Sequence, residues 1–181
     1  MNSWHCTKLL QLHSFLAVFT SLTNNLKMAD YLIADTDEEY SNAAILFKEY
    51  AALLNIDLSF QHFDEELMQL ETMYGSPDGG IILCKVENEF IGCVGLRRID
   101  RDTAELKRMF IKPAFQKQGA GKQLLEKAVE LARALKYSVI RLDTLNYMEA
   151  AIRLYEQYGF YEIPAYYRNP NKTAVYFELK C

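Results

Sequence analysis

Two glycines and two lysines lie close together at the start of a long amphipathic segment in the second half of the chain. Gly119 and Gly121 are flanked by Lys117 and Lys122 in the stretch QKQGAGK. Glycines just before a helix let the backbone approach a ligand closely and direct unpaired N–H groups at it. The helix dipole and the lysines add positive charge. This pattern favours an anion site, of the kind that holds a pyrophosphate without a metal ion.

Two common nucleotide-binding motifs do not fit this stretch. A Walker A loop requires G-x-x-x-x-G-K-[ST], but Gln116 occupies its first glycine position and Gln123 its hydroxyl position. A dinucleotide-binding fingerprint requires G-x-G-x-x-G, and Leu124 occupies its third glycine position. A plain helix N-terminus, with glycines that serve only the turn geometry, stays open at this point.

A carboxylate lies within a predicted central strand, TAELKRMFI at 103–111. Side chains alternate along a strand, which predicts one shared face for Glu105, Lys107, Met109 and Ile111. A charged residue in such a strand needs a partner or a cavity. Glu105 is therefore either a candidate general base or half of an ion pair with Lys107 or an arginine. A bulge in this strand would change which residues face a cleft.

Hydrophobic periodicity and turn residues predict the elements that position these side chains. Helices are predicted at 35–54, 64–75, 119–136 and 148–159. Strands are predicted at 31–34, 80–87, 90–99, 103–111, 138–145, 160–163 and 174–180. Because only some helices lie between strands, this order indicates an α/β (α+β) fold with a mixed sheet and helices on its faces.

Length and composition narrow the class of protein. The 181 residues suit one domain, and the net charge of −4 argues against nucleic-acid binding, which needs a basic face. The four cysteines form no CxxC pair and the three histidines have no zinc spacing, so no metal site is predicted. Cys84 and Cys93 lie in predicted strands and are expected to be buried thiols, which fits a reducing, cytoplasmic setting.

The first 27 residues differ from the rest of the chain. The apolar segment 8–22 contains Gln11, His13 and Ser14 and is too short and too polar to span a bilayer. We expect residues 1–27 to be a peripheral extension and residues 28–181 to form the domain, with no membrane partner. A membrane-tethered protein is the alternative, and it depends on residues 9–22 alone.

Two motifs resemble those of the GNAT N-acetyltransferases. The pattern Q-x-x-G-x-G/A after the strand ending RMFIKP, here Gln116, Gly119 and Gly121, resembles the acetyl-CoA-binding signature of that family. The stretch AIRLYEQYGFYEI, at 151–163, resembles its second motif. The order of elements from about 31 to 181 is also similar. The resemblance implies a mostly antiparallel central sheet flanked by helices, acetyl-CoA as co-substrate, an amine acceptor and no metal.

The resemblance also implies which residues contact the coenzyme. Backbone N–H groups of the glycine turn would hold the pyrophosphate, and the strand backbone at Met109 and Ile111 would pair with the pantetheine arm. A main-chain N–H near Met109 or Phe110 would stabilise an oxyanion. The family commonly has an asparagine where this chain has Met148, and Asn146 lies two positions earlier. The predicted contacts are Met109, Phe110, Ile111, Gln116, Lys117, Gln118, Gly119, Ala120, Gly121, Lys122 and Asn146.

Direct transfer is the implied chemistry: an amine attacks the thioester in a ternary complex, with no covalent enzyme intermediate. Tyr155 is the predicted general acid, since a phenol with a pKa near 10 can protonate a thiolate whose thiol has a pKa of about 8.5. Its other interpretation is a core aromatic in the helical stripe. Glu105 is the predicted base, acting directly or through water.

The acceptor is predicted to be a primary amine of a small molecule, an amino acid or a peptide. Tyr166, Tyr167 and Asn169 lie in a loop that is typical of a substrate site, and Arg97 would bind an acceptor carboxylate bidentately. The protein is expected to be a monomer or a homodimer. The alternative function is a non-catalytic acyl-CoA-binding or regulatory module with the same fold.

Overall fold

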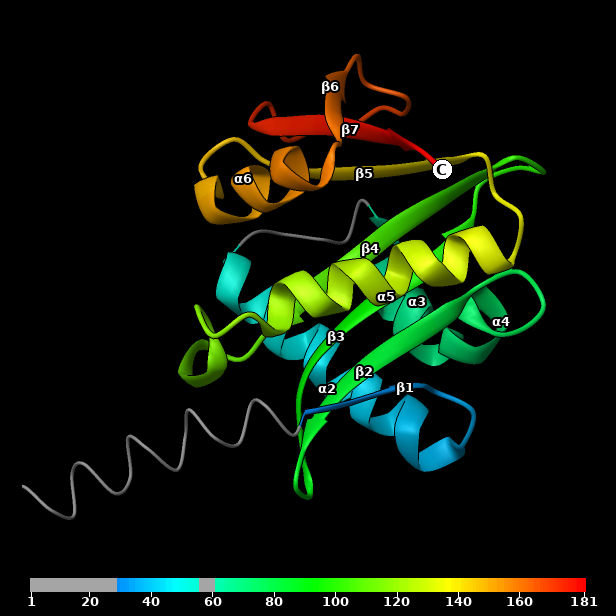
Figure 1. Ribbon diagram of the computed structural model, residues 1–181, viewed down its shortest axis with the longest axis vertical. Coiled ribbons are helices and arrows are strands. Elements are labelled where there is room, and N and C mark those ends of the chain that lie inside the picture. The colour runs from blue at the N-terminus through cyan, green and yellow to red at the C-terminus, as the bar shows by residue number, and fades with distance from the viewer. Residues whose placement is uncertain (1–28, 56–60) are drawn as a thin grey trace, which may run out of the picture.

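A single seven-stranded sheet organises the protein. The computed structural model describes residues 29–55 and 61–181, so the expectations for residues 1–27 lie outside the described residues. The sheet has the order β1-β2-β3-β4-β5-β7-β6, and every neighbouring pair is antiparallel except β4 and β5, which are parallel (Figure 1). This confirms the mixed, mostly antiparallel sheet. The strands are β1 Asp30–Ile33, β2 Gly80–Val86, β3 Glu89–Arg98, β4 Thr103–Ile111, β5 Val139–Leu145, β6 Tyr161–Ile163 and β7 Ala174–Lys180.

The helices lie close to the predicted positions, with one difference. The segment 64–75, predicted as one helix, forms two short helices that meet at Gln69, where φ is −130° and ψ is 30°. At the start of α2, Thr36 and Glu39 form a reciprocal capping box, which satisfies N–H groups of the first turn. The helices are α2 Asp37–Leu54, α3 Phe63–Met68, α4 Leu70–Tyr74, α5 Ala120–Ala134 and α6 Glu149–Tyr158, with a 3₁₀ turn at Pro113–Phe115.

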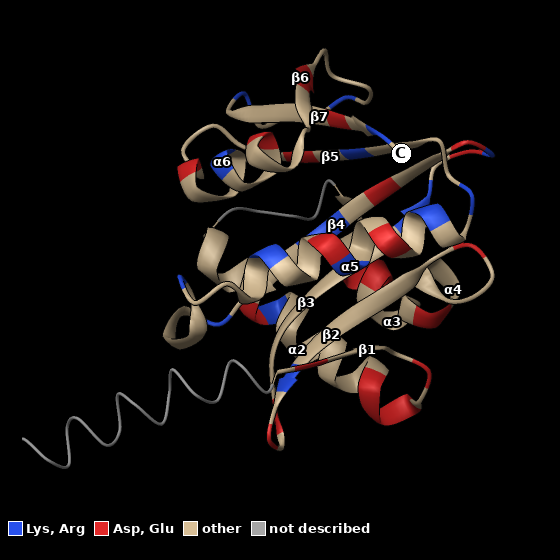
Figure 2. Cartoon of the chain, in the orientation of Figure 1, with Lys and Arg blue, Asp and Glu red and all other residues tan. Residues whose placement is uncertain are grey.

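Helices cover both faces of the sheet. In Figure 1, α5 crosses one face and α2, α3 and α4 lie behind the sheet on the other. The apolar stripe of α5, which includes Leu124 and Ala128, is fully buried in one hydrophobic core, while Phe47 of α2 and Tyr74 of α4 are buried in the second. Acidic and basic residues alternate along the outer side of α5 (Figure 2). The amphipathic pattern therefore fixes which side of α5 packs on the sheet.

A bulge in β4 changes the alternation that the sequence predicts. Lys107 pairs with Gly95 and Phe110 with Cys93, so two β4 residues stand opposite one β3 residue. Arg108, in the bulge, has a φ of 57°, an uncommon conformation for a residue with a side chain.

The prediction of one shared face for Glu105, Lys107, Met109 and Ile111 is therefore wrong. Met109 and Ile111 pack against the core beneath α5, whereas Glu105 and Lys107 face the cleft on the opposite side. The physical reason is the extra bulge residue, which shifts the two-residue period by one.

Among the described strands, β4 and β5 form the only parallel pair, and this pair is short. Its register joins Thr103, Ala104 and Glu105 to Val139, Ile140 and Arg141. Beyond these residues the two strands diverge, and the opening lies beside α6 and the N-terminal end of α5 (Figure 1). The later parts of β4 and β5 therefore border a gap in the sheet instead of completing a ladder with each other.

Candidate functional site

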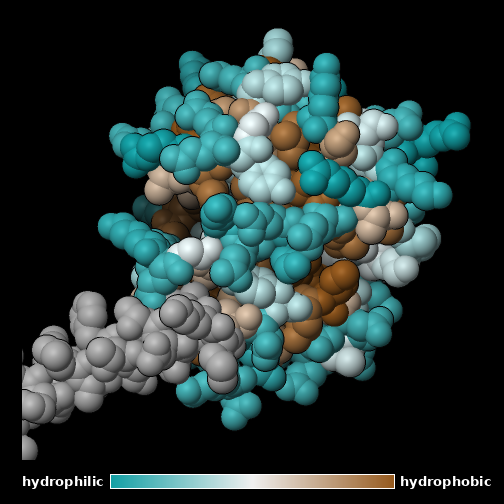
Figure 3. Space-filling model, in the orientation of Figure 1, coloured by the Kyte–Doolittle hydropathy of each residue, from teal (hydrophilic) through white to brown (hydrophobic). Residues whose placement is uncertain are grey.

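A small cavity occupies the opening between β4 and β5. Its volume is about 50 Å³, and Tyr155, Met109, Asp143 and Lys107 are among the residues that line it. In Figure 3, hydrophobic residues are visible between the polar side chains of α5 and α6, close to this opening. Strand backbone and a phenol hydroxyl therefore meet in one enclosed space.

Tyr155 extends from α6 into this space. Its side chain is 7% exposed, and its hydroxyl lies 3.8 Å from the sulfur of Met109. The ring packs on Phe160 and Phe177, with ring centroids 5.8 and 6.4 Å away. Tyr155 is thus both a core aromatic and a cavity residue. Burial raises its pKa above the ordinary value, so the phenol keeps its proton at neutral pH.

The glycine turn leads directly into α5. Gly119 has a φ of 94°, a backbone conformation that glycine adopts without strain, and α5 begins at the next residue. Because glycine has no side chain to accept the first N–H groups of the helix, those groups are left to a ligand or to solvent. The Gln116 side chain donates to the carbonyl oxygen of Ile111 at 2.9 Å, which ties the turn to the end of β4.

Space for an anionic ligand remains around the turn. A Cβ at Gly119 would meet nothing within 4 Å, and one at Gly121 would only make ordinary 3.8 Å contacts with Leu154 and Met109. Lys122 is exposed, and its amine lies 3.7 Å from Glu126. The donor set is backbone N–H plus lysine, which is the chemistry that a pyrophosphate requires.

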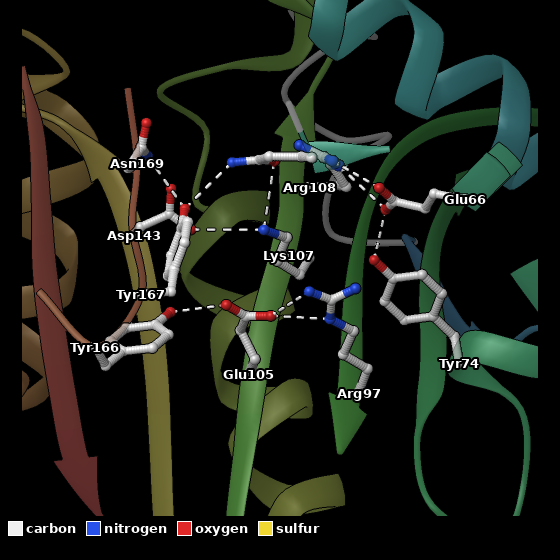
Figure 4. Close-up of polar contacts among 11 residues, drawn as sticks. Glu66, Tyr74, Arg97, Glu105, Lys107, Arg108, Asp143, Tyr166, Tyr167 and Asn169 are labelled. Atoms are coloured by element: carbon white, nitrogen blue, oxygen red, sulfur yellow. Dashed lines mark hydrogen bonds and ion pairs between the residues drawn. The ribbon is translucent and has the colours of Figure 1, made fainter. Parts of the chain in front are cut away.

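A larger cleft lies on the opposite face, between α3, β3, β4 and the loop before β7. Its volume is about 790 Å³. Glu105 is buried in it at 3% exposure, and Arg97 and Tyr166 approach its carboxylate from opposite sides (Figure 4). Arg97 donates from Nε and Nη2 to Oε2 at 2.8 and 2.7 Å, and the Tyr166 hydroxyl donates to Oε1 at 2.8 Å.

The ion pair decides the protonation state of Glu105. Burial by itself acts to raise the pKa of Glu105, but Lys107, Arg97 and the hydrogen bond from Tyr166 outweigh it, and the pKa lies below the ordinary value. Glu105 is therefore a carboxylate at neutral pH. The ion-pair alternative is the arrangement that the structure shows, with Arg97 as the partner.

Three of the predicted acceptor residues, Arg97, Tyr166 and Tyr167, line the cleft that holds this carboxylate, and Asn169 lines the smaller cavity instead. Tyr166 and Tyr167 make edge-on contacts with each other and with Tyr176, at centroid distances of 5.3 to 5.6 Å. Asn169 donates to the Tyr167 hydroxyl at 3.1 Å. Arg97 lies in the same cleft, but its Nε and Nη2 are directed at Glu105 instead of an acceptor carboxylate.

Two further groups that were not predicted, Asp143 and Gln61, contact Lys107 where the cavities meet; Gln61 lines both cavities and Asp143 lines the smaller one. Lys107 lies between the two, with Nζ 3.6 Å from Asp143 and 3.4 Å from Gln61 Oε1. Asp143 is a charged residue within a predicted strand, so the argument applied to Glu105 would have identified it. Gln61 carries no comparable signal.

Asn146 lies apart from these residues. It is exposed at the end of β5, its N–H donates to the carbonyl oxygen of Thr173, and it lines neither cavity within the described residues. Its contact with a coenzyme stays a prediction. In residues 29–55 and 61–181, no group of three histidine, cysteine or acidic side chains could hold a metal ion. No helix in the same ranges is long and apolar enough to cross a bilayer.

Comparisons with known proteins agree on one family. Residues 46–160 match the acetyltransferase (GNAT) family. An uncharacterized N-acetyltransferase of Dictyostelium discoideum is 30% identical to this chain in an alignment 206 positions long. The match covers 80% of this chain and 95% of that protein. An acetyltransferase from Streptococcus agalactiae has the same fold, with a TM-score of 0.70 and 24% identity over 84% of this chain and 98% of that one.

A second solved structure contains a ligand. It is a GNAT family acetyltransferase from Elizabethkingia anophelis with acetyl-CoA bound. Its sequence is 22% identical to this chain, the TM-score is 0.58, and the match covers 84% of this chain and 98% of that one. At these identities the solved structures show the fold, and the match over residues 46–160 together with the Dictyostelium relative shows the family. The chain belongs to the acetyltransferase (GNAT) family.

Proposed function

We propose that this protein is an acetyl-CoA-dependent N-acetyltransferase that acetylates a primary amine of a small molecule, an amino acid or a peptide. The observation that carries the proposal is the opening between β4 and β5, where Tyr155 and Met109 line one cavity and the glycine turn lies close by, since a Cβ at Gly121 would be 3.8 Å from Met109. The Elizabethkingia neighbour, which binds acetyl-CoA, supports the choice of donor.

The chain offers a distinct set of groups for each part of the donor. The N–H groups from Gln118 to Lys122 would hold the pyrophosphate, with Lys117 and Lys122 as additional charges. The β4 backbone at Met109 and Ile111 would hydrogen-bond the pantetheine arm, as an added strand does. When bound, acetyl-CoA supplies a thioester, which is an activated acyl group.

Three groups of this chain would act on the reacting atoms. The main-chain N–H near Met109 or Phe110, beside the bulge, would donate to the negative charge that develops on the acyl oxygen. Tyr155 holds a proton on its phenol oxygen for the departing thiolate. Glu105 is ionised and would accept the proton that the attacking ammonium must lose. The reaction would proceed by direct attack in a ternary complex.

The acceptor would enter through the larger cleft. Tyr166 and Tyr167 line it, and Asn169, which lines the smaller cavity, donates to the Tyr167 hydroxyl. Arg97 contributes a cationic group that is held by Glu105 and is partly exposed in the cleft. The buried thiols of Cys84 and Cys93 support a reducing, cytoplasmic setting.

Two measurements test the proposal. Isothermal titration calorimetry with acetyl-CoA should show one saturable site, and a thiol-release assay over a panel of amines should show turnover with at least one of them. Coenzyme binding without turnover on any amine, and without any effect of Tyr155→Phe, would instead support the non-catalytic acyl-CoA-binding module. If acetyl-CoA does not bind at all, both functions are wrong.

A further inference from the structure

Glu105 cannot meet an acceptor directly in the arrangement that the structure shows. Its side chain is 4% exposed, and both carboxylate oxygens are already engaged. Oε2 accepts two N–H groups from Arg97, and Oε1 accepts the hydroxyl of Tyr166. Tyr166 therefore offers a proton that arrives from the cleft a route to Oε1 that leaves the ion pair intact.

Tyr166 is built to hold this position. Its ring is packed edge-on against Tyr167 and Tyr176, and the guanidinium of Arg141 lies 5.5 Å from the ring centroid. The residue is partly exposed and lines the cleft, whereas Glu105 behind it is buried. The hydroxyl donates its hydrogen to Glu105, so its lone pairs stay available to accept an N–H from a bound ammonium.

We propose that Tyr166 relays the proton of the acceptor ammonium to Glu105, and that its hydroxyl is the group that contacts the acceptor nitrogen. This rests on the proposed N-acetyltransferase function. The N–H bond of the ammonium breaks as its proton bonds to Tyr166 Oη. The original O–H bond of Tyr166 breaks as its proton bonds to Glu105 Oε1. The products are a neutral amine, a neutral tyrosine and a protonated Glu105.

The surrounding charges are consistent with a relay instead of a tyrosinate base. Burial and the adjacent Glu105 raise the pKa of Tyr166, so the residue remains a phenol that passes a proton on without ionising. The charged groups around the pair come from several elements: Arg97 of β3, Lys107 of β4, and Arg141 and Asp143 of β5.

The test compares Tyr166→Phe with the wild-type enzyme over a series of amines whose ammonium pKa values range from about 7 to 10. For the most basic amines, kcat should fall about 100-fold, the lower end of what a positioned acid–base group contributes. The loss should shrink as the amine pKa approaches the assay pH, since less proton transfer is then required. The KM for acetyl-CoA should stay unchanged.

Tyr161→Phe is a matched control, because it removes a tyrosine–glutamate hydrogen bond to Glu178 on the same sheet, outside both cavities. It should keep wild-type kinetics. In Tyr166→Phe/Glu105→Gln, the loss should be no greater than in Glu105→Gln alone, since two members of one relay are not additive.

Each other outcome overturns a stated part of the inference. A kcat loss in Tyr166→Phe that is equal for all amines, or losses that multiply in the double variant, would show that Tyr166 only shapes the loop. Near wild-type kcat for basic amines would exclude the relay outright. If the wild-type enzyme acetylates none of the amines, both the proposed N-acetyltransferase function and the relay are wrong. If Tyr166→Phe fails to fold, Tyr166→Leu, which also lacks the hydroxyl, is measured over the same amine series and decides by the same criteria.

Discussion

Tyr155 and Glu105 each combine a structural contact with a position in one of the two cavities. Tyr155 belongs to the hydrophobic core beneath α5 and also lines the cavity between β4 and β5. Glu105 is an ion-pair partner of Arg97 and also the ionised carboxylate of the acceptor cleft. The two interpretations that the sequence offered for each residue are therefore not exclusive.

Replacing the Tyr155 hydroxyl separates its two roles. Because phenylalanine keeps the ring packing and removes only the proton donor, Tyr155→Phe should lower kcat by about 100-fold while the melting temperature changes little. Steady-state kinetics with a fixed amine and a thermal melt measure these effects. Tyr158→Phe, on the same helix, is the matched control and should keep wild-type kcat. Full activity of Tyr155→Phe would show that Tyr155 is not the acid.

Glu105 makes stability depend on pH in a definite direction. Its pKa is lower in the folded protein than in an unfolded chain, where a glutamate titrates near 4.3. The stabilisation is therefore present above that value and is lost as the pH falls through the lower folded pKa.

Urea unfolding between pH 7 and pH 3 measures this effect. The free energy of unfolding should fall toward acid in the wild-type protein and fall less steeply in Glu105→Gln. Glu65→Gln, which changes an exposed glutamate of α3, should follow the wild-type curve. Parallel curves for wild type and Glu105→Gln would contradict the linkage.

At the scale of single elements, the glycine turn and the β4 bulge place the backbone groups of the site. The turn fixes where the N-terminus of α5 points, and the bulge moves Met109 to the α5 face and leaves Glu105 and Lys107 on the other. The residues that face α5 and the larger cleft therefore lie on opposite faces of one strand. Under the proposed function, this division would let the donor and the acceptor approach the opening from different sides.

Gly119 and Gly121 should differ in what they tolerate. Gly119→Ala forces a side chain into a backbone with a φ of 94°, which should lower the free energy of unfolding by about 1 to 2 kcal/mol. Gly121→Ala only adds ordinary contacts within α5 and should leave the stability unchanged or slightly raised. Chemical denaturation of both variants measures the difference, and equal stabilities would show that the turn relaxes.

At the scale of the whole molecule, a buried ion pair joins the α3–α4 layer to the sheet. Arg108, at the bulge, binds the carboxylate of Glu66 through two hydrogen bonds of 2.6 and 3.1 Å. Tyr74 donates a third hydrogen bond to Glu66 at 2.6 Å (Figure 4). The Phe63 ring lies 5.0 Å from the guanidinium. The contact holds the uncommon backbone of Arg108 and the helices beside the acceptor cleft in one arrangement.

Breaking this pair should be costly. Arg108→Met leaves the Glu66 carboxylate buried without its charged partner, so the free energy of unfolding should fall by about 3 to 5 kcal/mol. Arg98→Met removes an exposed pair with Asp78 and should cost less than about 1 kcal/mol. Urea unfolding measures both. The double change Glu66→Leu/Arg108→Met should recover most of the lost stability. A small effect of Arg108→Met alone would show that water solvates the Glu66 carboxylate in the variant.

The sequence by itself determined the order of the elements, the glycine turn before α5 and the place of Tyr155 in its helix, because these depend on local patterns. Helical and strand periods, Gly119 before α5 and the spacing of LYEQYGF are all readable within a few residues. The break of 64–75 into two helices was not readable, since Gln69 is a permissible helix residue and tertiary packing decides its backbone.

Only the tertiary structure decided the face on which each β4 residue lies and which partner Glu105 has. The bulge at Arg108 is stabilised by Glu66, which is 42 residues away in the chain, and Tyr166 reaches Glu105 across 61 residues. No local pattern encodes such contacts, because they exist only after the helices, the strands and the loop before β7 have packed together. The turn that we propose for the donor is therefore encoded locally in the sequence, whereas the cleft that we propose for the acceptor is a property of the fold.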